Sequence, residues 1–258
     1  MASATHLFLK REKHALPLPV SQIEAVKGYG LEGDVHAHPI SPRQVLVTRQ
    51  EDLDALHIPS GALFENMILS GVDEHDFVPS ALLTVGDDVR IRLTFYCEPC
   101  YRVAHLVSDL AILKKKRGIL GVIQTSGTML PGDVVTCKPG VFESLSDVPY
   151  ERFVAFMRKV PPGKVVTYSA LLRGMGVAAA YVRAIPGYIR MAEKDGLGLP
   201  LHRIVASNGK SIADLPTDQL NLLRKEIVDE NAPSLLSASV SLEKYVWQEE
   251  SIWLVDEA

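Results

Sequence analysis

The sequence predicts two domains: a β-rich domain built as a barrel or sandwich, and a mostly α-helical domain that contains a helix-turn-helix. The chain has 258 residues, which is enough to bury two hydrophobic cores. As far as Gly140, short apolar runs alternate with Gly, Pro and Asp, which is typical of strands and tight turns. Beyond Gly140 the apolar residues recur at helical spacing, so we place the boundary near residues 140–148.

The first domain, residues 1–140, has its clearest strand at Val89–Phe95. Apolar residues there alternate with Arg and Thr, which is the period of a half-buried strand. A shorter apolar run covers Gln44–Thr48, and turn signals recur at Gly86-Asp87 and Pro131-Gly132. Several short strands at this spacing predict a barrel or a sandwich.

The second domain, residues 141–233, begins with an amphipathic pattern that predicts a helix over 149–159. A second helix is expected over 167–176, where glycines end it, and a third begins at residue 177. Helix, glycine-containing turn and helix are the outline of a helix-turn-helix. A last helix is expected from about residue 214 to residue 231.

Charge is distributed unevenly, although the net charge is only −4. Residues 1–140 carry −2, residues 152–225 carry +8 and residues 226–258 carry −7. The net charge of −4 alone would argue against a polyanionic partner such as DNA. The basic block favours such a partner. Two interpretations of the acidic tail, residues 234–258, stay open. It packs across one domain as a strap, or it competes with phosphate for the basic block.

Composition is that of an ordinary water-soluble protein, with 47% hydrophobic and 22% charged residues. No apolar run approaches the roughly 20 residues that span a bilayer, and the N-terminal residues show no signal-peptide pattern. Three cysteines, an odd and small number, do not suggest a disulfide framework. We therefore expect a cytoplasmic protein with no membrane partner.

The segment Cys97-Glu-Pro-Cys100 follows the strand at 89–95 and forms the first candidate site. A thiol at a strand end beside a proline is well placed for exposure, and Arg102 would lower its pKa. A thiolate is a soft ligand and a nucleophile, suited to molybdenum-type metals or to carrying sulfur. A buried cysteine pair or a labile disulfide remains the alternative. A zinc site would require a second cysteine pair.

An ordered series of short motifs accompanies this segment: Gly30-Leu-Glu-Gly-Asp34 with His36, Arg43-Gln-Val45, Phe64-Glu-Asn-Met-Ile-Leu-Ser-Gly71, Val85-Gly-Asp87, Glu98-Pro-Cys100 and Pro131-Gly-Asp133. In order and spacing the series resembles the MOSC domain, the C-terminal domain of molybdenum-cofactor sulfurases, over roughly residues 5–138. The resemblance implies a β-barrel in which Cys100 ligates the molybdenum of a pterin cofactor or carries a persulfide.

The same resemblance implies cofactor contacts at Arg43, Glu65 and Asn66, and Arg102 is counted with them. Asn66 could instead cap a turn, and Glu65 could pair with a structural arginine. Members of the family include reductases of N-hydroxylated compounds and accessory sulfur-handling modules. A molybdenum-cofactor-dependent oxidoreductase and a sulfurtransferase therefore both stay open, each with a redox partner or a sulfur donor protein.

Three stretches of the second domain resemble the DNA-binding domain of O6-alkylguanine-DNA alkyltransferases, and more closely the alkyltransferase-like proteins: Val160–Leu171, Val182–Ile185 and Pro200–Gly209. The resemblance implies a winged helix-turn-helix-like domain that binds alkylated or otherwise modified bases in DNA. The repair enzymes carry their alkyl-accepting cysteine where this sequence has Leu201. Leucine has no nucleophilic atom, so no methyl transfer is expected at this position.

Five residues are the predicted DNA contacts. The resemblance implies that Arg183 is the finger that enters the duplex and that Tyr168 helps to rotate the target nucleotide out of it. Thr167 lies at a helix N-terminus that offers N–H groups to phosphate. Arg190 and Arg203 belong to the basic residues that are expected to contact phosphates.

Two departures from the family pattern bear on base recognition. Pro186-Gly187 follows Arg183 closely and predicts a short or kinked recognition helix, which would misplace Arg190. The aromatic and glycine-rich pocket loop of the family is not recognisable after Lys210. Lesion discrimination is therefore a weaker inference than DNA binding.

Together the two domains predict a protein that recognises damaged or modified nucleobases, with molybdenum-cofactor or sulfur-carrier chemistry at Cys100. Two other functions stay open. One is a non-catalytic DNA-lesion binding protein in which the barrel is a docking module. The other is a sulfur-transfer protein that acts on another polyanion such as tRNA.

Overall fold

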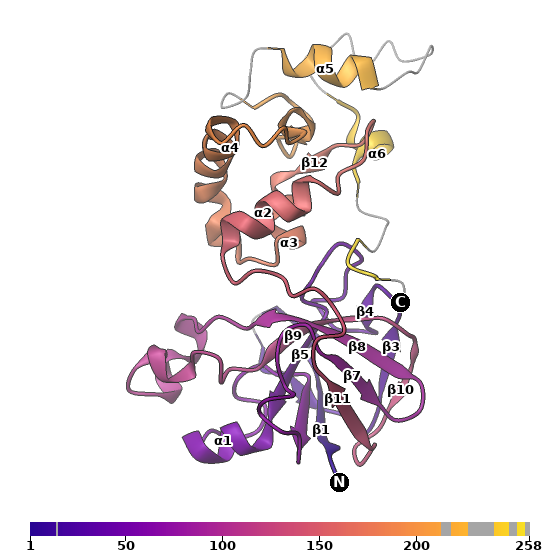
Figure 1. The fold of residues 1–258 in the computed structure, drawn as a ribbon, viewed down its shortest axis with the longest axis vertical. Helices are drawn as coiled ribbons and strands as arrows, with labels where there is room; N and C mark the ends of the chain where they lie inside the picture. Colours follow the sequence, from indigo (N-terminus) through magenta and orange to yellow (C-terminus); the bar gives the residue numbers. More distant parts are fainter. Residues whose placement is uncertain (14, 213–217, 227–239, 248–251, 256–258) are drawn as a thin grey trace. The chain divides into compact units, whose positions relative to one another are not determined.

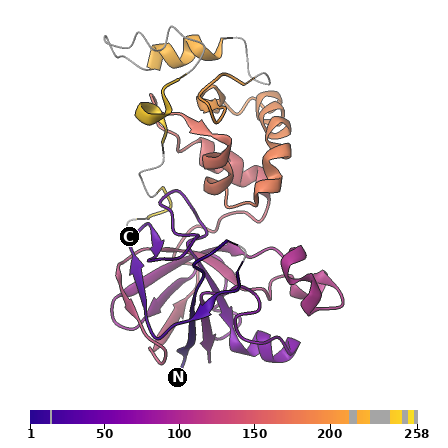
Figure 2. The same ribbon diagram turned by 180° about the vertical axis from the view of Figure 1, so that it is seen from behind.

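The computed structural model describes residues 1–255 except for 14, 213–217, 227–239 and 248–251. The chain forms two compact units, one comprising Met1–Asp147 and Ser251–Ala258, the other Val148–Glu250. In Figures 1 and 2 the first unit is the β structure coloured mainly from indigo to magenta, and the second is the mainly helical region. None of the helices in the described residues is both long and apolar enough to cross a membrane.

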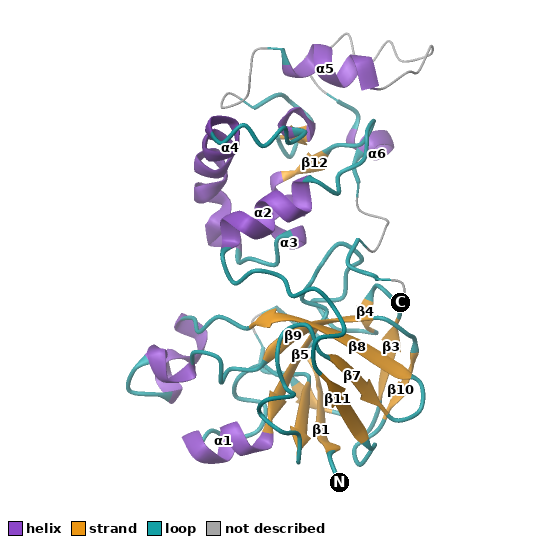
Figure 3. Ribbon diagram, in the orientation of Figure 1, coloured by secondary structure: helices purple, strands orange, loops and turns teal. Residues whose placement is uncertain are grey.

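The first unit is a β-barrel (Figure 3). Its main sheet contains β1 (Ser3–Leu9), β2 (Leu18–Pro19), β5 (Val45–Arg49), β6 (Met67–Ser70), β7 (Leu82–Val85), β8 (Val89–Tyr96), β9 (Ile119–Ile123) and β11 (Val135–Lys138). Their order is β11-β7-β8-β9-β5-β6-β1-β2, and every pair is antiparallel except β5 with β6. The Ala4 amide donates to the Asp133 carbonyl and the Val135 amide to the Ala2 carbonyl, each at 2.9 Å. The sheet therefore closes on itself.

The predicted strand at 89–95 is β8, but it is buried on both faces rather than one. Val89, Ile91 and Leu93 face the barrel core. On the other face, Arg92 is 5% exposed and donates to the carbonyls of Glu143 and Trp253. The Thr94 hydroxyl lies 3.0 Å from the Pro42 carbonyl, which precedes β5. The expectation of a half-buried strand is wrong because chain segments from outside the sheet cover these polar residues.

Smaller elements complete the first unit: a sheet of β3 (Ile23–Val26), β4 (Gly30–Leu31) and β10 (Gly127–Met129), the helix α1 (Gln50–Leu56) and the 3-10 helices η1 (Tyr101–Leu106) and η2 (Leu110–Leu113). A satellite core joins the helices, with Leu53, Val103 and Leu113 fully buried. This packing fixes the segment that follows Cys100, because Val103 lies within η1.

The second unit contains α2 (Pro149–Met157), β12 (Val166–Thr167), α3 (Tyr168–Gly174), η3 (Ala179–Ala184), α4 (Ile185–Lys194), η4 (Leu201–Arg203), β13 (Ile204–Val205), α5 (Gln219–Glu226) and α6 (Leu242–Tyr245). Helix α3, a glycine-containing turn, η3 and α4 form the predicted helix-turn-helix. A Cβ at Gly174 would lie 1.9 Å from Cε2 of Phe156, so α3 approaches α2 closely only with glycine there. Of the helix expected over 214–231, the described part is α5.

Pro186 does not kink a recognition helix. It lies in the first turn of α4, where its missing N–H is not needed by the helix. The segment before it is the separate 3-10 helix η3, which carries Arg183. Arg183 therefore stands on a short 3-10 helix of six residues, and Arg190 stands on the α-helix that follows it directly. Of the two expected outcomes, a short helix or a kinked one, the structure has the short helix.

The acidic tail contributes to both units where it is described. The Val240 amide donates to the Gly209 carbonyl, and the Trp247 amide donates to the Val165 carbonyl, each at 2.8 Å. Residues 240–247 therefore complete the second unit. In the first unit, Trp253 is 2% exposed and its ring N–H donates to the Ile40 carbonyl at 3.0 Å. Competition between the tail and phosphate stays a prediction.

Candidate functional site

A pocket lies in the barrel unit near the start of β5 and β9. It is lined by Lys10, His36, Arg43, Val45, Leu46, Phe64, Asn66, Cys97, Arg102, Arg117 and Leu120. Three residues predicted from sequence, Arg43, Asn66 and Arg102, are thus brought together from distant parts of the chain. Lys10 and Arg117 join them without having been predicted.

Cys100 stands beside this pocket in contact with one of its arginines. Nη1 of Arg117 lies 3.3 Å from Sγ of Cys100, and the same atom donates to the Glu98 carbonyl. The guanidinium that contacts the thiol is therefore that of Arg117 rather than Arg102. Cys97, by contrast, is 2% exposed, and all three cysteines are free thiols.

Several positively charged side chains line the pocket, and burial separates some of them from water. Lys10 is 2% exposed, with Nζ 4.7 Å from the centre of the Phe64 ring. Burial and the neighbouring Arg102 lower the pKa of Lys10, and Asp34 only partly opposes them. Burial likewise lowers the pKa of His36 to about 4, with Arg43 and Lys10 acting against Asp34. His36 is therefore neutral at pH 7.

Asp34 fixes three residues of the pocket through one carboxylate. It accepts hydrogen bonds from the backbone amides of Lys10 (3.0 Å) and His36 (2.8 Å) and from Nδ2 of Asn66 (2.8 Å). Oδ1 of Asn66 also accepts the Leu46 amide at 2.9 Å. Asn66 thus lines the pocket and at the same time joins β5 to the segment before β6.

Glu65 is placed in the scaffold instead of among the lining residues. It is completely buried, and Oε1 accepts the Gly61 amide at 2.5 Å. Burial raises the pKa of Glu65, although backbone hydrogen bonds and Arg117 act in the opposite direction. This placement favours a structural role for Glu65, and we do not propose Glu65 as a cofactor contact.

The donor set decides what kind of group fits the pocket. In the part of the chain that the structure describes, no three His, Cys, Asp or Glu residues cluster to hold a metal ion. A metal at Cys100 would therefore bring further ligands of its own. Lys10, Arg102 and Arg117 fit a group with several negative charges, such as the phosphate of a pterin cofactor. The residues present fit a molybdenum-pterin group.

Lys10 and Arg117 were not predicted because their sequence signals are weak. Lys10 directly follows an apolar strand, and this pattern predicts an exposed residue at the end of the strand. Arg117 ends the run Lys114-Lys-Lys-Arg117, which reads as an exposed charged turn. Only the closure of the barrel shows that these two side chains turn inward while their neighbours do not.

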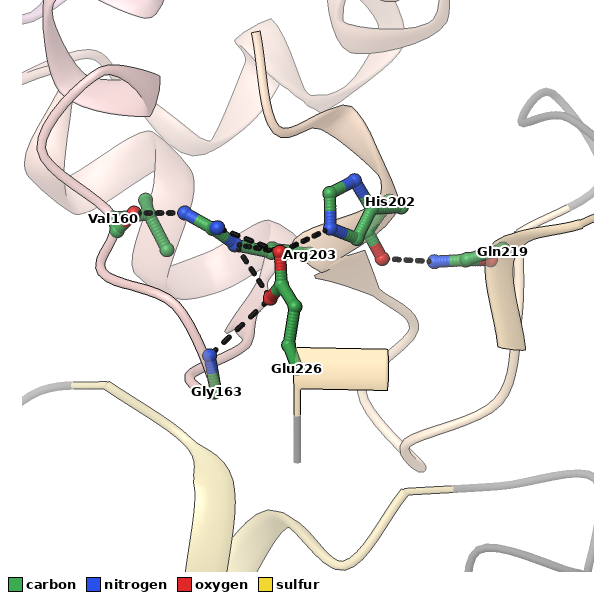
Figure 4. A network of polar contacts seen from close by, with 6 residues as sticks. All are labelled: Val160, Gly163, His202, Arg203, Gln219 and Glu226. Carbon is green, nitrogen blue, oxygen red and sulfur yellow. Dashed lines mark hydrogen bonds and ion pairs between the residues drawn. The ribbon is translucent and has the colours of Figure 1, made fainter. Parts of the chain in front are cut away.

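The second candidate site lies in the second unit around Glu226 (Figure 4). Glu226 accepts hydrogen bonds from Nε2 of His202 (2.8 Å), from Nη2 of Arg203 (2.7 Å) and from the Gly163 amide (3.2 Å). Burial alone would raise the pKa of Glu226, but these hydrogen bonds outweigh it and lower that pKa to about 2. Gln219 donates to the His202 carbonyl and so fixes the same loop from α5.

Leu201 occupies the acceptor position immediately before this network. It is 7% exposed and begins η4, whose next two residues are His202 and Arg203. The imidazole and the carboxylate that could activate a thiol are thus hydrogen-bonded together, and the neighbouring side chain is an alkyl group. This arrangement has no nucleophile to offer an alkylated base.

The predicted DNA contacts differ in their exposure and in their hydrogen-bond partners. Arg183 on η3 and Arg190 on α4 are exposed, and Tyr168 is half-buried at the start of α3. Thr167 caps α3, with Oγ1 accepting the Ala170 amide at 3.3 Å. Arg203 is 9% exposed and is bound to Glu226 and to the Val160 carbonyl. We therefore drop Arg203 from the proposed phosphate contacts.

Two solved structures are similar to parts of this chain. The YuaD protein of Bacillus subtilis is 15% identical, covers 54% of this chain and 97% of its own, and has a TM-score of 0.47. Atl1 of S. pombe, in complex with damaged DNA containing O6-carboxymethylguanine, is 26% identical, covers 41% of this chain and 99% of its own, and has a TM-score of 0.33. No curated protein matches the chain.

Two family models match the chain, each within one of the units described above. The MOSC domain model matches residues 32–136, which include Cys100 and most of the pocket. The model of the 6-O-methylguanine DNA methyltransferase DNA binding domain matches residues 149–228, which include His202 and Glu226. Both predicted resemblances are confirmed. The chain therefore combines a MOSC domain with a DNA-binding domain of the 6-O-methylguanine DNA methyltransferase family.

Proposed function

We propose that this protein binds damaged or modified bases in DNA through its second unit without repairing them there. The observation that carries the proposal is Leu201, a buried alkyl side chain beside an intact His202–Glu226 pair. Binding a modified base needs a DNA-binding surface and a place for the base, whereas removing its alkyl group needs a nucleophile. The chain carries a DNA-binding domain of this kind and has no nucleophile at position 201.

Arg183 is the residue on which the proposed DNA contact depends most. It is exposed on η3, the 3-10 helix between α3 and α4, within a segment of net charge +8. An inserted cation that fills the gap left by a rotated base stabilises the opened duplex. Tyr168 and Arg190 support it, and the N-terminus of α3 behind Thr167 offers amide groups to phosphate.

The test compares two duplexes that differ only in one O6-methylguanine. The full-length protein should bind the modified duplex more tightly and should not remove its methyl group. Arg183→Ala should weaken binding to both duplexes by tenfold or more, while Arg158→Ala, an exposed arginine at the end of α2, serves as the charge-matched control. Equal affinity for the two duplexes would contradict lesion recognition, and methyl transfer to the protein would contradict its non-catalytic character.

For the barrel we propose a molybdenum-pterin group or a persulfide at Cys100. Cys100 would supply the thiolate, and Lys10, Arg102 and Arg117 would hold the anionic part of the group. A bound molybdenum-pterin group would supply two-electron redox or sulfur chemistry. His36 is neutral at pH 7 beside these cations, so its ring can donate a hydrogen bond through one nitrogen and accept one through the other.

The matched thiol for this test is Cys137. Its Sγ lies 3.2 Å from the Asp76 carbonyl, and burial raises its pKa to about 12, so it stays protonated. Molybdenum, pterin and persulfide are measured in the full-length protein as isolated. Cys100→Ser should abolish whichever is found, and Cys137→Ser should leave it unchanged. If the wild-type protein holds none of the three, the proposed chemistry fails and a docking role for the barrel takes its place.

A further inference from the structure

Exposed basic and aromatic residues flank, in sequence, the residues of the Cys100 pocket, and none of the functions above uses them. The ladder between β8 and β9 ends at the pair Tyr96 and Ile119, but the two segments stay together beyond it. The Cys97 amide donates to the Gly118 carbonyl at 2.9 Å, and Arg117 reaches Cys100. The residues just before Arg117 therefore lie opposite the residues that surround Cys100.

We propose that these residues, called the rim and defined as Tyr101 with Lys114, Lys115 and Lys116, bind single-stranded nucleic acid and hold a strand at the mouth of the Cys100 pocket. The proposal rests on the function proposed for the barrel and adds its substrate class. The group that reaches Cys100 is then a nucleotide within a strand and not a free nucleoside.

Tyr101 provides the stacking surface. It follows Cys100 directly and is 80% exposed, more than any other large hydrophobic side chain except Met1 among the described residues. An aromatic ring left in water beside a pocket is a platform on which any base can stack. Stacking there would place the neighbouring nucleotide at Arg102, which lines the pocket.

The three lysines provide the charge that follows a phosphate backbone. All three are exposed, whereas Arg117, the next residue, is buried in the pocket. Lys115 has φ of 64°, and its Nζ lies 5.5 Å from the centre of the Tyr96 ring. The side chain of Lys115 therefore lies against the end of β8.

Carboxylates also lie near these lysines. Burial raises the pKa of Asp52, and Arg49 and Lys116 oppose that rise. Burial together with Asp147, Glu74 and Asp52 raises the pKa of Tyr96, over whose ring Lys115 lies.

Nucleic acid explains this combination better than an acidic peptide does. An acidic peptide would be attracted by the lysines but would leave the exposed tyrosine without a partner, whereas a strand offers phosphates and base faces together. The same chain also carries a DNA-binding domain, which would raise the local concentration of strand around the barrel. The rim and that domain would then act on one molecule.

The experiment measures how salt affects binding of a fluorescent twelve-nucleotide oligothymidine to the full-length protein. Arg183→Ala is present throughout, so that the second unit contributes less. The test pair is Lys114→Gln with Lys116→Gln, which leaves Lys115 in its turn. The control pair is Lys27→Gln with Lys138→Gln, two exposed lysines of the same unit that do not line the pocket.

Loss of two phosphate contacts should flatten the slope of log affinity against log salt by about 1.4, because each contact to a single strand contributes about 0.7. The control pair should keep the wild-type slope. Tyr101→Ala should weaken binding about tenfold with the slope unchanged, since stacking is not ionic. Equal slopes for the test and control pairs would overturn the proposal, as would unchanged affinity in Tyr101→Ala.

A second readout locates the strand directly. Oligothymidine with one 4-thiothymidine should photo-crosslink to the peptide that contains Tyr101, and crosslinks confined to the second unit would overturn the proposal. Failure here is distinguishable from failure of the proposed lesion binding. With Arg183 restored, a variant that carries only Lys114→Gln and Lys116→Gln should still bind duplex with O6-methylguanine, and its metal and pterin content should be unchanged.

Discussion

The pocket of the barrel and the network of the second unit contain similar side chains but opposite arrangements of charge. Around Glu226, an arginine and a histidine share one carboxylate, and every ionic group of the network has a partner within hydrogen-bond distance. Around Cys100, Lys10 and two arginines gather near a thiol, and burial with Arg102 lowers the pKa of Lys10 in spite of Asp34. The first arrangement is complete in itself, whereas the second is suited to receive an anion.

The difference teaches that a basic residue acts as a binding residue only where the fold leaves its charge available. Arg203 was predicted to contact DNA because it lies in a basic segment beside a family motif. The structure instead uses it to hold η4 against Glu226 and the Val160 carbonyl. Arg117 was not predicted, yet it carries the guanidinium that contacts Cys100.

The largest effect that would test this comparison is expected from Glu226→Gln. With a neutral amide in place of the carboxylate, Arg203 is a nearly buried cation with no anionic partner among the described residues, and His202 and Arg203 compete for one amide oxygen. We expect the second unit to lose about 3 kcal/mol of stability, as when one member of a largely buried ion pair is removed. The first unit should be unaffected.

The chain contains two tryptophans, and each reports on one unit. Trp247 packs against Phe156 in the second unit, and Trp253 is buried in the first. Urea unfolding of Glu226→Gln in the Trp253→Phe background follows the second unit alone, and in the Trp247→Phe background the first alone. A shift of similar size in both backgrounds would mean that the network is not specific to the second unit.

The pH dependence of the stability of the second unit should reveal the contribution of the Glu226 carboxylate. The pKa of Glu226 is about 2 in the folded protein and near 4.5 in an unfolded chain, so the unfolded state takes up the proton first as pH falls. The stabilisation by Glu226 is fully present above pH 4.5 and is lost as pH falls toward 2. Trp247 fluorescence should show this loss in the wild type and not in Glu226→Gln. An identical pH profile for the two proteins would remove Glu226 as its source.

A smaller and opposite effect is expected from Lys10→Met in the barrel. This change removes a buried cation whose pKa burial already lowers, so the barrel should keep its stability or gain up to about 1 kcal/mol. Because Lys10 helps to lower the pKa of His36, that pKa should rise above about 4. Nuclear magnetic resonance titration of the His36 ring measures it. An unchanged His36 pKa would mean that Lys10 does not act on the pocket.

Sequence alone predicted the architecture because its signals are local. Alternation at 89–95 and the helical spacing from 149 to 157 follow directly from strand and helix geometry, and both elements are present. The expectation that failed, a strand at 89–95 buried on only one face, depends on contacts with residues elsewhere in the chain. Arg92 is buried because Trp253 and Glu143 offer it carbonyl groups, and no local pattern contains that information.

The candidate sites were predictable only in part, for the same reason. Arg43, Asn66 and Arg102 line one pocket, the first two as family motifs indicated and the third as its nearness to Cys100 indicated. Glu65, beside Asn66, points into the scaffold. Neighbours in sequence alternate between pocket and scaffold according to local backbone direction. Short motifs identify the segment that carries a site, and the fold decides which side chains of that segment reach it.

An effect similar in size to that of Lys10→Met is expected at the two tryptophans and tests how the tail is attached. In Trp253→Phe the Ile40 carbonyl loses its donor, and Ile40 precedes by three residues the pocket arginine Arg43. We expect a loss of about 1 kcal/mol in the barrel, with faster amide exchange over residues 38–43. Trp247→Phe is the matched control, because the ring N–H of Trp247 is buried without a hydrogen-bond partner in the described residues. Removing that N–H should cost less, since no acceptor is left behind. Equal losses for the two variants would mean that ring packing alone attaches the tail, and that the hydrogen bond to Ile40 does not help to position Arg43.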